Sequence, residues 1–120
     1  MNIEELREYC LSIKGAAESF PFDEKTLVFK VVDKMFTYIN LEPKDGIFKA
    51  DMKCDPERSV SLRESYRGIN RGTHTTALTW NTVMLNGDVP DKLIRELINH
   101  SVEEVIKKLS KKKQKEYYGT

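Results

Sequence analysis

Nine lysine and arginine side chains are the residues of this sequence whose type and spacing indicate the clearest chemistry. Arg63, Arg67 and Arg71 recur at intervals of four, which aligns side chains along one face of a helix if the helix extends that far. Guanidinium and ammonium groups gathered on one surface contact phosphate oxygens. The other six cations assigned to this candidate surface are Lys34, Lys44, Lys49, Lys53, Lys111 and Lys112. The alternative for all nine side chains is that they belong to ordinary solvated surface. The C-terminal lysines have a second alternative, in which they interact with the negative end of a helix dipole.

The overall charge limits how strongly such a surface could bind a polyanion. The formal net charge is +1 and the sequence pI is about 7.7, whereas dedicated nucleic-acid-binding domains often exceed a pI of about 9. The charge is uneven, because residues 1–60 carry a net −3 and residues 61–120 a net +4. Any contact with DNA is therefore expected to be weak and largely independent of base sequence.

Histidine and cysteine offer little further chemistry. The spacing of Cys10 and Cys54 matches no zinc or redox motif, and both are predicted to be buried free thiols. His74 is interpreted as a hydrogen-bonded structural residue on a strand, and His100 as a local or surface group. The sequence contains no glycine-rich phosphate loop and no dinucleotide fingerprint. We therefore expect no metal, no cofactor and no catalytic residue.

The first half of the chain predicts one helix followed by three strands. Apolar residues at helical spacing indicate an amphipathic helix over residues 2–14. Residues 26–32, 35–41 and 47–53 are predicted strands, joined by links too short for a parallel crossover. In the third, Phe48, Ala50 and Met52 alternate with Lys49, Asp51 and Lys53, so the charged side chains are expected to face solvent.

The second half predicts a helix, two strands and a helical end. Asp55 followed by Pro56 is typical of a helix start, and this helix is expected to run to about Tyr66. Residues 72–76 and 81–86 are predicted strands, and the indole of Trp80 is expected to fill space between the sheet and its helices. One helix is predicted from Pro90 and a second from Ser101, where Ser-x-x-Glu has the form of a capping box. Residues 111–120 are expected to form a frayed basic tail.

The order α-β-β-β-α-β-β-α predicts an α+β fold in which helices pack on one face of a mainly antiparallel sheet. A chain of 120 residues fits one domain, residues 1–120. It contains no apolar run of about 20 residues, and no secretory leader is expected, because residues 1–5 lack the basic start and apolar centre of a signal peptide. A cytoplasmic location is expected.

Several short motifs then resemble the MmcQ/YjbR family, in the same order along nearly the whole chain. They are Phe20-Pro21-Phe22-Asp23, Thr26 to Val31, Lys34-Met35-Phe36, Lys53-Cys54-Asp55-Pro56-Glu57, Leu62-Arg63-Glu64, Gly72-x-His74 and Trp80-Asn81-Thr82-Val83. The sequence departs from the family pattern at residues 75–79, which lack the usual basic side chains. It also departs at Ser101-Val102, where the family usually has Ser-Tyr.

The resemblance implies a two-layer architecture similar to frataxin-like (CyaY-like) proteins and type III secretion chaperones. It also implies a DNA-binding role through a double-wing motif, two β-hairpin projections that here would carry Lys34 and Lys44. Cys54, Asp55, Pro56, His74, Trp80 and Asn81 are the family-motif residues.

Three functional hypotheses remain open at this point. The first is a non-enzymatic DNA-binding protein of the MmcQ/YjbR type. The second is a protein-interaction or chaperone-like module, as a homodimer or with another partner. The third is an enzyme that uses His74 with Cys54 or Arg63, which requires a cleft that brings these side chains together.

Overall fold

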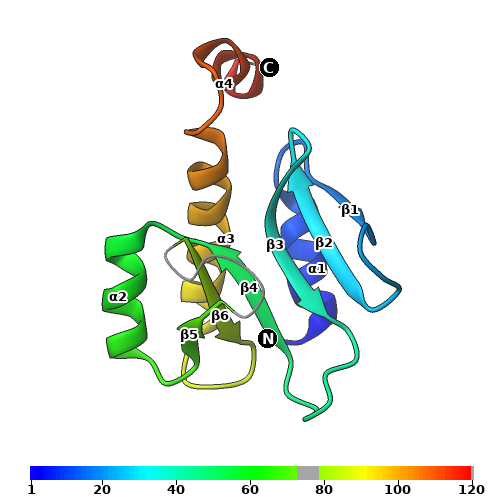
Figure 1. Ribbon diagram of the computed structural model, residues 1–120, viewed down its shortest axis with the longest axis vertical. Coiled ribbons are helices and arrows are strands. Elements are labelled where there is room, and N and C mark those ends of the chain that lie inside the picture. Colours follow the sequence, from blue (N-terminus) through cyan, green and yellow to red (C-terminus); the bar gives the residue numbers. More distant parts are fainter. Residues whose placement is uncertain (73–78, 120) are drawn as a thin grey trace.

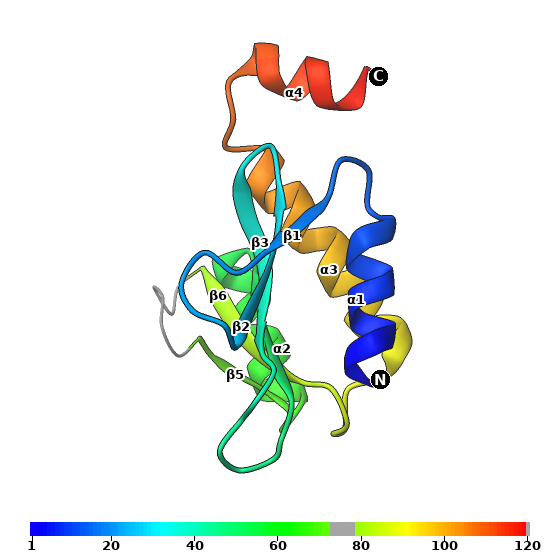
Figure 2. The ribbon, with the colours of Figure 1, turned by 90° about the vertical axis from the view of Figure 1, so that its right-hand side faces the viewer.

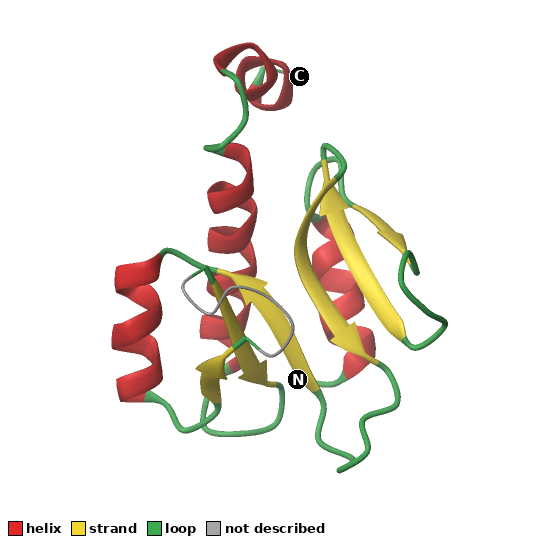
Figure 3. Ribbon diagram, viewed as in Figure 1, coloured by secondary structure: helices red, strands yellow, loops and turns green. Residues whose placement is uncertain are grey.

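The computed structural model describes residues 1–72 and 79–119, and within them it contains four helices and six strands. Figure 1 shows their arrangement along the chain and Figure 3 separates helices from strands. The elements are α1 (Ile3–Ser12), β1 (Ala17–Ser19), β2 (Thr26–Val31), β3 (Lys34–Asn40), β4 (Lys49–Lys53), α2 (Pro56–Ser65), β5 (Ile69–Arg71), β6 (Trp80–Met84), α3 (Asp91–Ile106) and α4 (Lys111–Tyr118).

The six strands form one antiparallel sheet in the order β1-β2-β3-β4-β6-β5. Seen from the side, α1 and α3 lie on the same face of this sheet (Figure 2). The predicted two-layer α+β fold is therefore confirmed. The sequence did not predict β1, because three residues are too few to show the period-two alternation of a strand.

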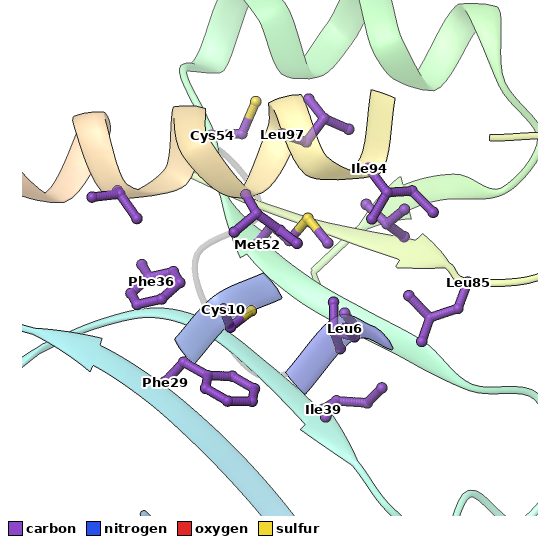
Figure 4. Close-up of a cluster of buried hydrophobic side chains, with 14 of the residues drawn as sticks. Leu6, Cys10, Phe29, Phe36, Ile39, Met52, Cys54, Leu85, Ile94 and Leu97 are labelled. Carbon is purple, nitrogen blue, oxygen red and sulfur yellow. The ribbon is translucent and has the colours of Figure 1, made fainter. Parts of the chain in front are cut away.

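The hydrophobic core fills the space between the sheet and the helices α1 and α3 (Figure 4). Leu6 and Cys10 point from α1 toward Phe29 and Ile39 of the sheet, and α3 contributes Ile94 among others. Leu6 and Cys10 are four residues apart, so both lie on the buried face of α1. Their burial agrees with the predicted amphipathic pattern of the first helix.

The opposite face of the sheet carries a second, smaller cluster of Val28, Tyr38 and Trp80. The Tyr38 and Trp80 rings pack with centroids 5.5 Å apart. The expectation that the indole lies between the sheet and its helices was wrong. Val28 and Tyr38 are cross-strand partners, and each is followed by a residue of the helix-side core, so their side chains face the other way.

The expectation that Asp51, on this same face, points into solvent was also wrong. The alternation of β4 is as predicted, because Ala50 and Met52 belong to the helix-side core. However, Asp51 is only 4% exposed. Tyr38 and Thr82 pair with it from the neighbouring strands and cover it.

The C-terminal helices also differ from the prediction. The predicted helix start at Ser101 was wrong, because α3 continues through this position to Ile106. The Ser101 hydroxyl oxygen lies 2.6 Å from the Lys53 carbonyl of β4 and 2.9 Å from the Leu97 carbonyl inside the helix, and its single proton is shared between these two acceptors. The break comes later, where Ser110 caps α4 by accepting from the Lys113 amide. Residues expected to be frayed, 111–118, form that helix.

Of the next two predicted elements, the strand moved and the helix did not. The strand predicted at residues 72–76 falls largely outside the described residues, and β5 lies before it, at Ile69–Arg71. The helix expected over residues 55–66 begins and ends nearly as predicted, at Pro56–Ser65. None of the helices in the described part of the chain has the length and apolar character of a membrane span.

Candidate nucleic-acid interface

Antiparallel pairing brings cations from distant parts of the sequence to one end of the sheet. Lys34 begins β3 and Lys53 ends β4, and the start of one antiparallel strand lies beside the end of its neighbour. The hydrogen bond from Ser101 to the Lys53 carbonyl holds the C-terminal half of α3 at this same end. Lys108 follows directly after α3.

Lys34 and Lys108 both act on the charge of Lys53. Partial burial lowers the pKa of Lys53, and repulsion from Lys108 and Lys34 lowers this pKa further, while Glu104 opposes the shift. Glu104 itself pairs with Lys107 at 2.7 Å. An anion at this place would relieve the repulsion that Lys53 experiences from Lys34 and Lys108.

Helix α4 extends the same end of the molecule beyond α3 (Figures 1 and 2). Its first residues, Lys111 and Lys112, are exposed. Val32 of the β2–β3 turn lines the same surface hollow as Tyr117, which places α4 beside the turn that precedes Lys34. The Tyr117 hydroxyl donates to the Lys14 carbonyl at 2.6 Å and fixes the far end of α4.

We name this surface the cationic end and define it by Lys34, Lys53, Lys108, Lys111 and Lys112. Within residues 1–72 and 79–119, none of the five forms an ion pair. Asp33 and Glu104 are carboxylates of the same region, so the surface is predominantly but not wholly positive.

The remaining lysines of the sequence prediction lie elsewhere. Lys44 sits in the β3–β4 loop, at the opposite end of β3 from Lys34. Lys49 begins β4 near that loop, and its ammonium group lies 3.2 Å from the Asp45 carboxylate. The two proposed wings therefore stand about 20 Å apart along β3, at about 3.4 Å per residue.

The three arginines do not line one helix face, because α2 ends at Ser65, before Arg67. Arg63 turns back onto α2, where its Nε donates to the Ser59 carbonyl at 3.2 Å. The Arg67 amide donates to Asp88, and Arg71 ends the edge strand β5 with an exposed side chain. Arg63 and Arg67 lie where α2 leads into the start of β5, away from the cationic end. Arg71 instead ends β5 at the same end of the sheet as Lys53, two strands away, because Arg71 pairs with Asn81 and Lys53 pairs with Trp80.

The motif Cys54-Asp55-Pro56 builds the junction between β4 and α2. Asp55 is the N-cap of α2 and accepts from the Arg58 amide at 3.0 Å, with Pro56 at the first helical position, as predicted. Cys54 and Cys10 are buried free thiols, as predicted, and burial raises the pKa of each thiol, to about 12 for Cys10.

His100 has a structural role that the sequence did not reveal. Its Nε2 accepts from the Asp55 backbone amide at 3.1 Å, which ties α3 to the start of α2. The interpretation as a local or surface group was therefore wrong, since the partner lies 45 positions away. Burial and then repulsion from Arg58 lower the pKa of His100.

Of the family-motif residues His74, Trp80 and Asn81, His74 lies outside the described residues. Trp80 belongs to the cluster on the helix-free face, and Asn81 points to the helix side with 2% of its surface exposed. In the described part of the chain, no three His, Cys, Asp or Glu side chains come together to hold a metal ion.

Lys108 is the member of the cationic end that sequence reasoning missed. From the sequence, the lysines of residues 107–115 are interpreted as cations that meet the negative end of a helix dipole, and Lys108 is one of them. The predicted antiparallel order places the end of β4 beside the start of β3, and so brings Lys53 near Lys34. Finding Lys108 requires knowing, in addition, that the C-terminal end of α3 lies at this same edge. Which helix end meets that edge could not be read from the sequence.

The fold is that of a small two-layer α+β protein with a six-stranded antiparallel sheet. The chain belongs to the YjbR family, whose family model matches residues 11–103. It is 30% identical over 116 residues to YjbR of Escherichia coli K12, covering 96% of each chain. It is 29% identical over 112 residues to YbdF of Escherichia coli O157:H7, covering 93% of this chain and 90% of that one.

Two solved structures share the fold. Protein DR2400 of Deinococcus radiodurans, assigned to the domain family DUF419, superposes with a TM-score of 0.88 at 35% identity, covering 98% of this chain and 88% of that one. A protein from Pseudomonas syringae superposes with a TM-score of 0.73 at 26% identity, covering 84% of this chain and 96% of that one.

Proposed function

We propose that this protein is a cytoplasmic, non-enzymatic DNA-binding protein whose cationic end contacts the phosphate backbone. The observation that supports this role is the convergence of lysines from three separate segments, β3, β4 and the region after α3, without ion pairs among the described residues. The two buried free cysteines fit a reducing compartment.

The proposed binding is weak and does not depend on base sequence. Phosphate contacts by lysines carry no base information, and no helix of the cationic end presents an established base-reading surface. Five contacts to duplex DNA predict a slope of log K against log salt of about −4.5, and a dissociation constant of about 1–100 µM at physiological salt.

The test is a fluorescence-anisotropy titration of a labelled DNA duplex at several salt concentrations. The double variant Lys53→Gln with Lys108→Gln is expected to reduce the steepness of the salt slope by about 1.8. Lys44→Gln is the matched control, since it removes one exposed lysine at the opposite end of β3 and is expected to leave the slope unchanged. A slope near zero for the wild type would rule out the proposal.

The same titration separates the cationic end from the double-wing arrangement. If both hairpin turns hold the duplex, Lys34→Gln and Lys44→Gln weaken binding equally. If the cationic end holds it, only Lys34→Gln weakens binding. The family resemblance supports the first arrangement, whereas the lysine positions favour the second.

A protein-interaction role is the second candidate, and it is supported by exposed aromatic side chains. Phe20 and Phe22, in the connection between the edge strand β1 and β2, are 48% and 67% exposed. Exposed aromatic rings beside a sheet edge are typical of contact surfaces. Gel filtration with light scattering tests it: a dimer that Phe22→Ser dissociates supports this role, and a strict monomer argues against a homodimer.

A further inference from the structure

One face of the C-terminal helix α4 carries a surface hollow of about 400 Å³. Lys111, Gln114, Lys115 and Tyr118 are spaced at i, i+3, i+4 and i+7, so their side chains lie along this face. The residues that line the hollow are these four and Gly119, the C-cap of the helix. Among the described residues, α4 and its cap therefore form a floor without an opposite wall. We name this surface the outer face of α4.

Tyr118 supplies a flat aromatic surface to the outer face of α4. The residue is 61% exposed, and its ring packs edge-on against the Tyr117 ring, with centroids 5.2 Å apart and an angle of 83°. An edge-to-face contact covers at most one face of a ring. At least one face of the Tyr118 ring therefore stays open to a planar ligand.

The helix that carries this ring is fixed to the body of the protein. The Tyr117 hydroxyl donates to the Lys14 carbonyl at 2.6 Å, and the Lys14 ammonium lies 5.6 Å from the centroid of the Tyr117 ring. At the other end of α4, the Gln114 amide donates to the carbonyls of two residues that precede the helix. A ring held in place before binding loses less conformational entropy when a ligand arrives.

The charge of the outer face favours an anion. Lys111 and Lys115 lie one helical turn apart, which separates their Cβ atoms by about 5–6 Å. Neither forms an ion pair within residues 1–72 and 79–119. Glu116, the carboxylate of α4, lines a different hollow together with Lys14. Lys111 also belongs to the cationic end, so the outer face continues that surface.

A flat ring beside two ammonium groups matches the chemistry of an unpaired nucleotide. The phosphates of a nucleic-acid strand contact lysines, and its bases stack on aromatic side chains. In a duplex each base is covered by its neighbours in the stack, whereas the bases of an unpaired strand can be splayed onto a protein ring. Stacking tolerates any base, in agreement with binding that does not depend on sequence.

We propose that the outer face of α4 binds an unpaired DNA strand, with one base stacked on the Tyr118 ring and the adjacent phosphates at Lys111 and Lys115. This inference rests on the proposed DNA-binding function, because the strand continues from the cationic end. It adds a preference for the form of DNA, at duplex ends or single-stranded stretches, that the lysines of the cationic end do not provide.

The test compares two fluorescent probes in anisotropy titrations of the full chain. One is an oligothymidylate of about 12 nucleotides, and the other is a blunt duplex of the same length with the dye in its interior. Tyr118→Leu is expected to weaken binding of the single strand about tenfold and to leave duplex binding within about twofold. Tyr118→Phe keeps the ring and is expected to retain the affinity of the wild type.

Two further variants separate stacking from charge. Lys115→Gln is expected to reduce the steepness of the salt slope for the single strand by about 0.7, whereas Tyr118→Leu is expected to leave this slope unchanged. Phe22→Leu is the matched control, because it removes another exposed aromatic ring, in the β1–β2 connection. It is expected to change neither titration. Because α4 buries no side chain, all of the α4 variants are expected to fold, which circular dichroism checks.

The outcomes distinguish this inference from the function on which it rests. If the duplex binds and Tyr118→Leu leaves single-strand binding within twofold, only the stacking site is refuted. An equal loss with Tyr118→Phe also refutes it, since the ring would then not be what binds. If neither probe binds at low salt, both proposals are refuted. Single-strand binding that depends on Tyr118, without any duplex binding, supports the stacking site and refutes the contact of the cationic end with duplex DNA.

Discussion

Asn81 offers the sharpest test of how well the core is understood, because its replacement by leucine is expected to stabilise the protein. The side chain is 2% exposed, and neither its Oδ1 nor its Nδ2 has a hydrogen-bond partner within the described residues. Met52, Val83 and Leu97 surround it, together with a void of about 10 Å³. Such a void is at the lower limit for one water molecule.

The expected gain follows from these contacts. A buried polar group without a partner costs about 1–3 kcal/mol, and leucine has the same branching at Cγ without polar atoms. Leucine is also bulkier than asparagine, and overpacking offsets part of the gain. We expect a net increase of about 1–2 kcal/mol in the free energy of unfolding, which raises the melting temperature by about 4–8 °C for 120 residues.

Urea unfolding and calorimetry of Asn81→Leu measure both quantities. Asn70→Leu on β5 is the control, because Asn70 is exposed and its change is expected to stay within about 0.5 kcal/mol. Asn81→Val adds less volume and separates overpacking from pairing. A loss of stability in both Asn81→Leu and Asn81→Val would refute the reasoning, since it would show that the amide is paired.

Three further predictions concern the junction at α2 and the buried thiols. Asp55→Ala removes the N-cap of α2 and is expected to lower the free energy of unfolding by about 1 kcal/mol, whereas Asp55→Asn is expected to retain most of it; urea titrations that find the two equal contradict the cap. The pKa of His100 is lowered on folding, so stability is expected to fall as the pH drops below about 6.5, and His100→Gln is expected to flatten this part of the pH profile. Identical profiles would exclude His100 as the cause. Cys10 and Cys54 are expected to resist a thiol reagent at pH 8 until urea unfolds the chain, and rapid labelling of the native protein would show that the thiols are accessible.

For the cationic end, the sequence identified which residues are charged but not which of them lie close together in the fold. Residue type identified the lysines and arginines as candidates for phosphate contact, but three arginines at intervals of four imply a surface only if the helix continues. Because α2 ends at Ser65, Arg67 and Arg71 leave its face. The convergence of Lys34, Lys53 and Lys108 depends on which ends of two strands and one helix meet.

Local signals determined much of the fold. The spacing of Leu6 and Cys10, the alternation along β4 and the Asp55-Pro56 start of α2 each depend on residues a few positions apart, and all three agree with the structure. The short links between the first strands also required an antiparallel sheet. These features are set by the geometry of one helix turn or one strand, which is written in consecutive residues.

Tertiary structure alone decided what depends on partners distant in the chain. The burial of Asp51, the position of Trp80 on the helix-free face, the bond from His100 to Asp55 and the continuity of α3 through Ser101 all require a neighbouring strand or helix. A serine that could cap a helix is instead satisfied by a carbonyl 48 positions away. Sequence specifies which groups need partners, and packing determines which partner each group receives.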